Sequence, residues 1–176
     1  MTGVQTCALP IFTVSAVQMA SAYQTLANGG VRLPVRLVES CRKADGTVQR
    51  VTDGSPTRVI SSSAARSTVD MLENVATKGW LASEVRIPGY RIGIKTGTAQ
   101  EVDASGGYSK NYLVSMAGVA PADHPKYVVY VALSQPTKLN SSEASAPIWQ
   151  KVMARALQTG GVVPSGSSSP DLPATW

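Results

Sequence analysis

Apolar and polar positions alternate with a helical period near the start of the chain. Ser15 and Gln18 match a capping box, which satisfies the free backbone donors of a helix start. Asn28, Gly29 and Gly30 follow, and such residues tolerate the left-handed backbone that ends many helices. The sequence therefore predicts a helix over residues 16–27. Its expected buried positions are Met19, Ala22, Tyr23 and Leu26.

Two later stretches have the same spacing. Residues 63–77 begin at a run of three serines (61–63) that can cap a helix. Residues 146–158 carry Pro147 in their first turn. A Gly-Gly pair at 160–161 comes directly after the second stretch. We expect two helices here. Their predicted core positions are Ala65, Leu72, Val75 and Ala76 in the first, and Ile148, Trp149, Val152, Met153, Ala156 and Leu157 in the second.

Period-two alternation predicts the strands. Residues 35–39 and 47–51 flank Asp45-Gly46, a hairpin signal. Three further strands are expected at about 90–99, 112–120 and 126–133, and residues 123–125 (Asp-His-Pro) make the last turn. Because short turns join antiparallel strands, we predict an α+β fold. Three sequential C-terminal strands form an antiparallel sheet that is packed by helices.

The two ends of the chain differ from its middle in composition. Residues 161–176 are rich in Ser, Pro and Gly, which predicts a disordered tail. Residues 1–11 do not join naturally to the helical stretch after them and resemble translated sequencing-adapter sequence. We therefore expect them to be non-native, the alternative being a native loop and strand. The predicted domain covers residues 12–160.

Composition excludes several classes of function. The net charge of +5 comes from scattered Lys and Arg residues without a like-charged run, which argues against a nucleic-acid-binding stripe. No stretch approaches the ~20 apolar residues of a membrane span. A single histidine and two cysteines, Cys7 and Cys41, do not make a zinc cluster, and we expect Cys41 to be inert. No metal is therefore predicted.

The sharpest chemical signal is Lys95-Thr96-Gly97-Thr98, at the end of an alternating strand. The lysine adds positive potential, and the two threonine hydroxyls can bind a carboxylate. Gly97 allows a backbone or ligand to approach closely, and an extended peptide can pair with such a strand. The backbone N–H of Thr98 can stabilise a tetrahedral oxyanion. The alternative is a surface strand that ends in small polar residues.

The motif and its flanks resemble class B penicillin-binding proteins. The similarity is collinear over about residues 12–160 and implies a partial penicillin-binding/serine β-lactamase-like transpeptidase fold. Ile94 stands where the family has glycine, which changes packing beside the site, and Ala16 stands where many members have proline. The stretches that carry the resemblance are 14–23 (Val-Ser-Ala-Val-Gln-Met-Ala-Ser-Ala-Tyr), 27–31 (Ala-Asn-Gly-Gly-Val), 87–90 (Ile-Pro-Gly-Tyr), 95–100 (Lys-Thr-Gly-Thr-Ala-Gln) and 120–125 (Ala-Pro-Ala-Asp-His-Pro).

The resemblance implies a function for the full-length protein. It is a serine-type peptidoglycan D,D-transpeptidase that cross-links cell-wall stem peptides through an acyl-enzyme. Lys95 and Thr98 are its catalytic residues in this chain, and Lys95, Thr96, Gly97 and Thr98 bind substrate. Stem peptides ending in D-Ala-D-Ala, β-lactams, and division or elongation glycan-polymerising proteins are the implied partners, with no cofactor. The implied location is the cell membrane, with the domain extracytoplasmic.

The resemblance places the nucleophile and the Ser-x-Asn motif upstream of the first helix. Ser40-Cys41-Arg42-Lys43 matches Ser-x-x-Lys but falls in a predicted hairpin, whereas the lysine must lie one helical turn from the serine. Ser109-Lys110-Asn111 comes in the wrong order, and His124 is expected to be a turn residue. We therefore expect the chain alone to be inactive. Two alternatives remain: a D-Ala carboxypeptidase or serine β-lactamase relative, and a non-catalytic module that binds wall peptides.

Overall fold

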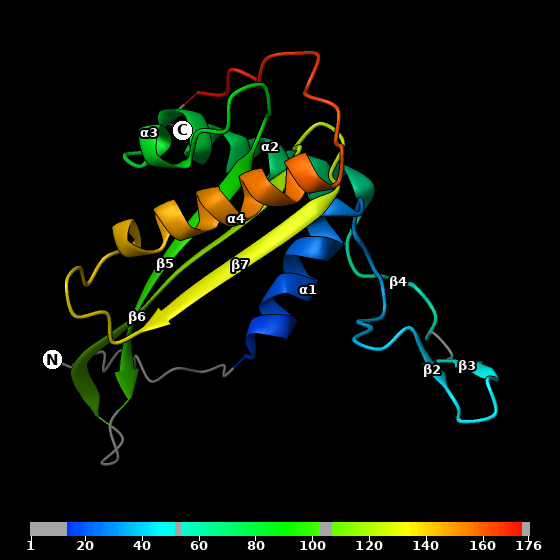
Figure 1. Ribbon diagram of the computed structural model, residues 1–176. Helices are drawn as coiled ribbons and strands as arrows, with labels where there is room; N and C mark the ends of the chain where they lie inside the picture. Colours follow the sequence, from blue (N-terminus) through cyan, green and yellow to red (C-terminus); the bar gives the residue numbers. More distant parts are fainter. Residues whose placement is uncertain (1–13, 52–53, 103–106, 174–176) are drawn as a thin grey trace, which may run out of the picture.

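A three-stranded antiparallel sheet forms the centre of the computed structural model, which describes residues 14–51, 54–102 and 107–173 (Figure 1). Its strands are β5 (Gly93–Val102), β6 (Tyr108–Ala120) and β7 (Tyr127–Ser134), in the order β5-β6-β7. Both pairs are antiparallel, as in a meander of consecutive strands. The predicted sheet and the α+β fold class are confirmed, with strand bounds that shift by a few residues.

Helices cover both faces of this sheet (Figure 1). Helix α4 (Ala146–Thr159) lies on one face, and α1 (Ala16–Ala27) and α2 (Ser62–Lys78) lie on the other. The three predicted helices are therefore confirmed. The sequence reasoning missed α3 (Ala82–Val85) and the 3-10 turn η1 (Ser142–Ala144), because elements of three or four residues are too short to show a period.

Helix α1 begins with the predicted capping box. The Ser15 backbone N–H donates to Gln18 Oε1 at 2.8 Å, and the Gln18 N–H donates to Ser15 Oγ at 3.2 Å. The predicted buried face is only partly right. Thr25 is the buried side chain, Met19, Tyr23 and Leu26 are half-buried, and Ala22 is exposed. The helix turns one side toward the sheet near its C-terminal end and leaves its first turns uncovered.

An exposed arm connects α1 to α2. The predicted strand over 35–39 is wrong, because these residues form neither helix nor strand, whereas the strand predicted over 47–51 is confirmed over residues 48–50. Pro34 lacks a backbone N–H to donate, which disfavours a strand at the start of this stretch. At its other end the Glu39 carbonyl accepts from the Val51 N–H at 3.2 Å, next to the pair of β2 and β3. The Asp45-Gly46 turn is confirmed: Gly46 has φ +85° and Asp45 accepts from the Thr47 N–H at 2.9 Å. The arm contains β1 (Val31–Arg32) paired with β4 (Thr57–Arg58), and β2 (Ser40–Arg42) paired with β3 (Val48–Arg50).

Trp149 is the largest fully buried side chain and sits between α4 and the sheet. Its Nε1 donates to the Val129 carbonyl at 3.1 Å, so the indole is buried with its polar atom satisfied. The predicted face of this helix was too wide, because Ile148 and Val152 are 41% and 48% exposed. The residues that meet the sheet recur three and four positions apart; they are Ala146, Trp149, Met153 and Leu157.

Gly118 on β6 provides the space that this indole occupies. A Cβ at position 118 would lie 2.5 Å from Trp149 Cζ2 and 2.6 Å from the Gly93 carbonyl oxygen. We expect Gly118→Ala to lower the free energy of unfolding by about 1–3 kcal/mol through overpacking. Chemical denaturation measures this value. Gly166→Ala is the control, because nothing lies within 4 Å of its Cβ position. Equal midpoints for the two variants would contradict this packing.

The segment after α4 contains no helix or strand over residues 161–173, yet it lies against the body of the molecule. Tyr90 donates its hydroxyl to the Val162 carbonyl at 2.6 Å, and the Ser165 N–H donates to the Gly89 carbonyl at 2.9 Å. Composition predicted a disordered tail here, whereas the described part makes these specific contacts. Residues 174–176 and the adapter-like residues 1–11 lie outside the described residues. No helix in the described part of the chain has the length and apolar content to cross a membrane.

Candidate functional site

Residues 95–98 lie within strand β5, at one edge of the central sheet. Lys95 and Thr98 are exposed residues, and Thr96 and Gly97 are half-buried. The only neighbour of β5 in this sheet, among the described residues, is β6. The motif therefore occupies an open strand edge that belongs to the centre of the fold and not to a remote loop.

The register shows which backbone groups of β5 face this open edge. The Gln135 N–H donates to the Tyr112 carbonyl at 2.8 Å, so even-numbered residues of β6 direct their backbone groups toward β7. Odd-numbered residues of β6 then face β5, where Ala117 pairs with Lys95 and Ser115 with Gly97. The backbone N–H and C=O of Thr96 and Thr98 consequently point away from β6. These are the groups that an added extended peptide would pair with.

The side chains of the motif alternate between the two faces of the sheet. Ile94 packs in the core cluster of α4, which places Thr96 and Thr98 on that side and Lys95 on the side of α2. Lys95 Nζ lies 3.1 Å from the Thr96 carbonyl oxygen, which is one of the outward groups of the edge. The cation is thus held at the edge that would receive a substrate.

Ser142 of η1 contacts the motif from the α4 side of the sheet. Its hydroxyl lies 3.1 Å from Thr98 Oγ1 and donates to the Gly97 carbonyl at 3.3 Å. Ser142 is 4% exposed and Thr98 is exposed, so the contact between their hydroxyls is partly buried. Sequence reasoning missed this residue, because it lies 44 positions after Thr98 and has no motif of its own.

Gly97 and Ile94 of strand β5 are both closely packed against their neighbours. A Cβ at Gly97 would lie 2.6 Å from Ser115 Oγ, so the position has little room for a side chain. Ile94, which replaces the glycine usual in the resembling family, is 1% exposed and fills the core beside Trp149. The departure from the family pattern therefore falls on the buried face and not on the open edge.

Three cavities among the described residues have volumes of about 570, 870 and 640 Å³. The largest is apolar and lies between α1 and the arm, and the other two lie beside the C-terminal segment. None of these three is lined by residues 95–98. The β5 edge therefore lies outside these three cavities and contributes one strand wall to a site.

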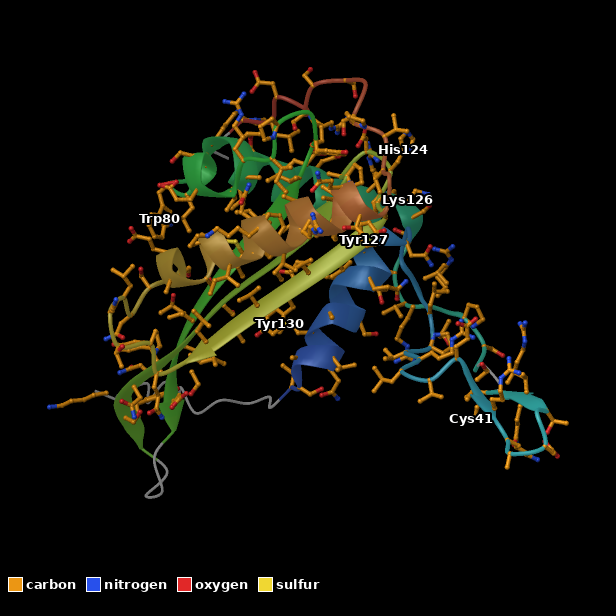
Figure 2. All side chains as sticks on the ribbon, viewed as in Figure 1. Cys41, Trp80, His124, Lys126, Tyr127 and Tyr130 are labelled. Atoms are coloured by element: carbon orange, nitrogen blue, oxygen red, sulfur yellow. The ribbon has the colours of Figure 1, made fainter. Side chains whose placement is uncertain are left out.

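The other candidate motifs lie away from this edge. Ser40–Arg42 form strand β2, so Lys43 is not one helical turn from Ser40, and Figure 2 shows Cys41 on the projecting arm. Cys41 is a free, exposed thiol, whereas Cys7 lies outside the described residues. Ser109–Asn111 belong to β6, and His124 is exposed in the turn before β7 (Figure 2). Within the described ranges, no three potential metal ligands lie together.

A buried ion pair near the start of β5 was also missed. Glu73 on α2 is fully buried, and its carboxylate accepts from Arg91 Nε at 2.9 Å and from Nη2 at 2.7 Å. The hydrogen bonds to Glu73 raise the pKa of Arg91. Burial opposes ionisation of Asp123, but a Ser165 hydrogen bond and the nearby Arg91 charge leave its pKa below the usual value. Glu73 was not among the predicted core positions of its helix, although it lies next to one of them, Leu72.

Comparisons with known proteins identify the family of this chain. A family model described as "Penicillin binding protein transpeptidase domain" matches residues 5–154. Penicillin-binding protein PbpB of Mycolicibacterium smegmatis is 33% identical, over 93% of this chain and 28% of its own length. Peptidoglycan D,D-transpeptidase FtsI of Escherichia coli is 34% identical, over 90% of this chain and 26% of its own length. The chain spans about a quarter of the length of these relatives.

Solved structures show the same fold. Penicillin binding protein 3 of Mycobacterium tuberculosis, complexed with ampicillin, superposes with a TM-score of 0.78 at 29% identity, over 89% of this chain and 37% of that one. A peptidoglycan synthetase of Bifidobacterium adolescentis superposes with a TM-score of 0.81 at 27% identity. The match covers 93% of this chain and 30% of that one. The similarity therefore extends over nearly all of this chain and a minor part of each neighbour.

Proposed function

Because this chain belongs to the penicillin-binding protein transpeptidase family, with class B members among its homologues, we propose that the whole protein is a peptidoglycan D,D-transpeptidase. It cross-links stem peptides through a serine acyl-enzyme. The observation that carries the proposal is the position of Lys95–Thr98 at the open edge of β5. The outward backbone groups of this edge suit an extended donor peptide.

In this proposal, the donor stem peptide binds at the β5 edge. The terminal carboxylate of the stem peptide binds to the hydroxyls of Thr96 and Thr98, and Lys95 supplies the opposite charge. The outward N–H of Thr98 helps to stabilise the oxyanion that forms at the attacked carbonyl, an effect worth about 3–4 kcal/mol per donor. Ser142 keeps the Thr98 side chain in place through the 3.1 Å contact between their hydroxyls.

The covalent steps require a serine that we place outside the described residues. Its hydroxyl oxygen attacks the penultimate D-Ala carbonyl, the bond to the terminal D-Ala breaks, and D-Ala leaves with the proton on its amine. An amine of a neighbouring stem then attacks the acyl-enzyme and releases the serine. The cation at Lys95 also favours deprotonated groups near it, as activation of the serine requires.

β-Lactams are the second proposed class of ligand. They mimic the D-Ala-D-Ala end and trap the serine, and structures of Mycobacterium tuberculosis penicillin binding protein 3 exist with ampicillin and with aztreonam. We further propose an extracytoplasmic position at the cell membrane. Glycan-polymerising proteins of division or elongation would be the neighbours of the enzyme there.

Turnover of a stem pentapeptide by the intact protein tests this function against its alternatives. With an acceptor amine present, a transpeptidase forms the cross-linked product. A carboxypeptidase releases D-Ala at the same rate with or without the amine, and a β-lactamase hydrolyses nitrocefin. Reversible peptide binding without release of D-Ala would identify a non-catalytic module and contradict the proposal.

The 176-residue chain by itself gives a separate prediction. Its Ser-x-x-Lys match starts at Ser40 in strand β2, where no lysine lies one helical turn below the serine. We expect no covalent labelling when the chain is incubated with a fluorescent penicillin, in contrast to the intact protein. Gel fluorescence and intact mass measure the labelling. An acyl adduct on a serine of this chain would contradict the placement of the nucleophile elsewhere.

A further inference from the structure

We propose that Arg91, held by Glu73, is a positioning residue for the donor-binding strand β5. The proposal rests on the function proposed above and extends it to a pair outside the Lys-Thr-Gly motif. Arg91 does not touch the motif; it lies four residues before Lys95, which corresponds to roughly 13 Å along an extended strand. Its action on the site is therefore through the strand.

The contact between Arg91 and Glu73 fixes the relative orientation of the two side chains as well as the distance between them. Two parallel hydrogen bonds, of 2.9 and 2.7 Å, join the planar guanidinium to the carboxylate. The side chains are 10% and 0% exposed, so solvent screens the pair only weakly. A bidentate pair of this kind holds the orientation of its partners more tightly than an apolar contact does. The start of β5 is thus tied to helix α2 in one geometry.

Arg91 also connects the strand to two further segments. Its carbonyl accepts from the Ala122 N–H at 2.8 Å, in the turn between β6 and β7. Its backbone N–H donates to Ser165 Oγ at 3.1 Å, and Nη1 donates to Ser167 Oγ at 3.0 Å, both in the C-terminal segment. Ser165 Oγ in turn donates to Asp123 Oδ1 at 2.8 Å. One residue therefore joins α2, the β6–β7 turn and the C-terminal segment to the start of the site strand.

Strand β5 needs such an anchor because it is an edge strand. Within the described sheet, β6 holds it on one side and its other side faces the proposed substrate. The packing at its start is close: a Cβ at Gly93 would lie 3.0 Å from Leu72 Cβ on α2. A change in how α2 meets the strand would therefore move β5, and with it the outward groups of Thr96 and Thr98. A displacement of about 1 Å at such a site lowers rates by about a hundredfold.

Amide hydrogen exchange of this chain tests the anchor without any need for activity. In Glu73→Gln, which keeps the side-chain shape, we expect the inward amides of Lys95 and Gly97 to exchange about a hundredfold faster. The amides of Val129 and Val131 on β7 should keep their rates. Glu84→Gln is the matched control, an exposed glutamate on α3. Equal acceleration of the β5 and β7 amides would show a merely global effect and would overturn the proposal.

A second variant separates positioning from stability. In Glu73→Leu/Arg91→Met, an apolar pair replaces the ion pair, and such replacements restore stability in other proteins. In the intact protein we expect a near-wild-type melting temperature together with acylation that is at least tenfold slower. Wild-type acylation by this variant would overturn the proposal. If the intact wild-type protein is not acylated at all, the proposed function fails, and the exchange experiment still decides whether the pair anchors β5.

Discussion

Replacement of Lys95 by alanine in the intact protein is expected to lower the acylation rate by a β-lactam about 10²–10³-fold. The side chain is exposed at the β5 edge, and Nζ lies 3.1 Å from the outward Thr96 carbonyl oxygen. Its loss removes the positive charge opposite the substrate carboxylate and beside the developing oxyanion. The fold should be unaffected, because the side chain contributes nothing to the core clusters.

The second-order rate constant of labelling by a fluorescent penicillin measures this effect. Lys110→Ala is the matched control, since Lys110 is an exposed lysine on β6 of the same sheet. We expect the control to be acylated at the wild-type rate. Acylation of Lys95→Ala at that same rate would remove Lys95 from the catalytic machinery.

Replacement of Trp149 by alanine is expected to have the largest effect on stability, a loss of about 3–5 kcal/mol. The indole is 0% exposed, fills the space above Gly118, and donates a hydrogen bond to Val129. The variant therefore creates a large cavity and leaves the Val129 carbonyl with one hydrogen-bond donor fewer. Domains of this size have total stabilities of about 5–15 kcal/mol, so much of the stability would be lost.

Chemical denaturation followed by far-UV circular dichroism measures this loss. Ile148→Ala provides the comparison, because Ile148 is the preceding residue on α4 and is 41% exposed. We expect its free energy of unfolding to change by less than about 1 kcal/mol. Similar values for the two variants would show that α4 does not pack on the sheet through Trp149.

The sheet and the long helices were predictable because their signals are local and strong. The capping box at Ser15, Pro147 in the first turn of α4, and the alternation into Lys95 each specify an element within a few residues. The arm between α1 and α2 was not predictable in detail. Its strands are two or three residues long and, apart from the half-buried Val31, exposed, so no buried face imposes an alternation on them.

The same distinction between local and long-range signals applies to the residues of the site. Lys95–Thr98 are contiguous, so one motif reveals the charge, the hydroxyls and the glycine together. Ser142 meets the motif across 44 residues, and Glu73 meets Arg91 across 18. Such contacts depend on the tertiary packing of η1 and α2, which no spacing in the sequence encodes. The structure was needed to find them.

A crystal structure of the intact protein acylated by ampicillin tests the central claim most directly. We predict that the carboxylate of the bound drug lies within about 3 Å of the Thr96 and Thr98 hydroxyls, with the acyl carbonyl oxygen accepting from the Thr98 N–H. Lys95 should lie beside the same ligand. A drug bound covalently while the β5 edge stays empty, with its carboxylate held by other residues, would contradict this account.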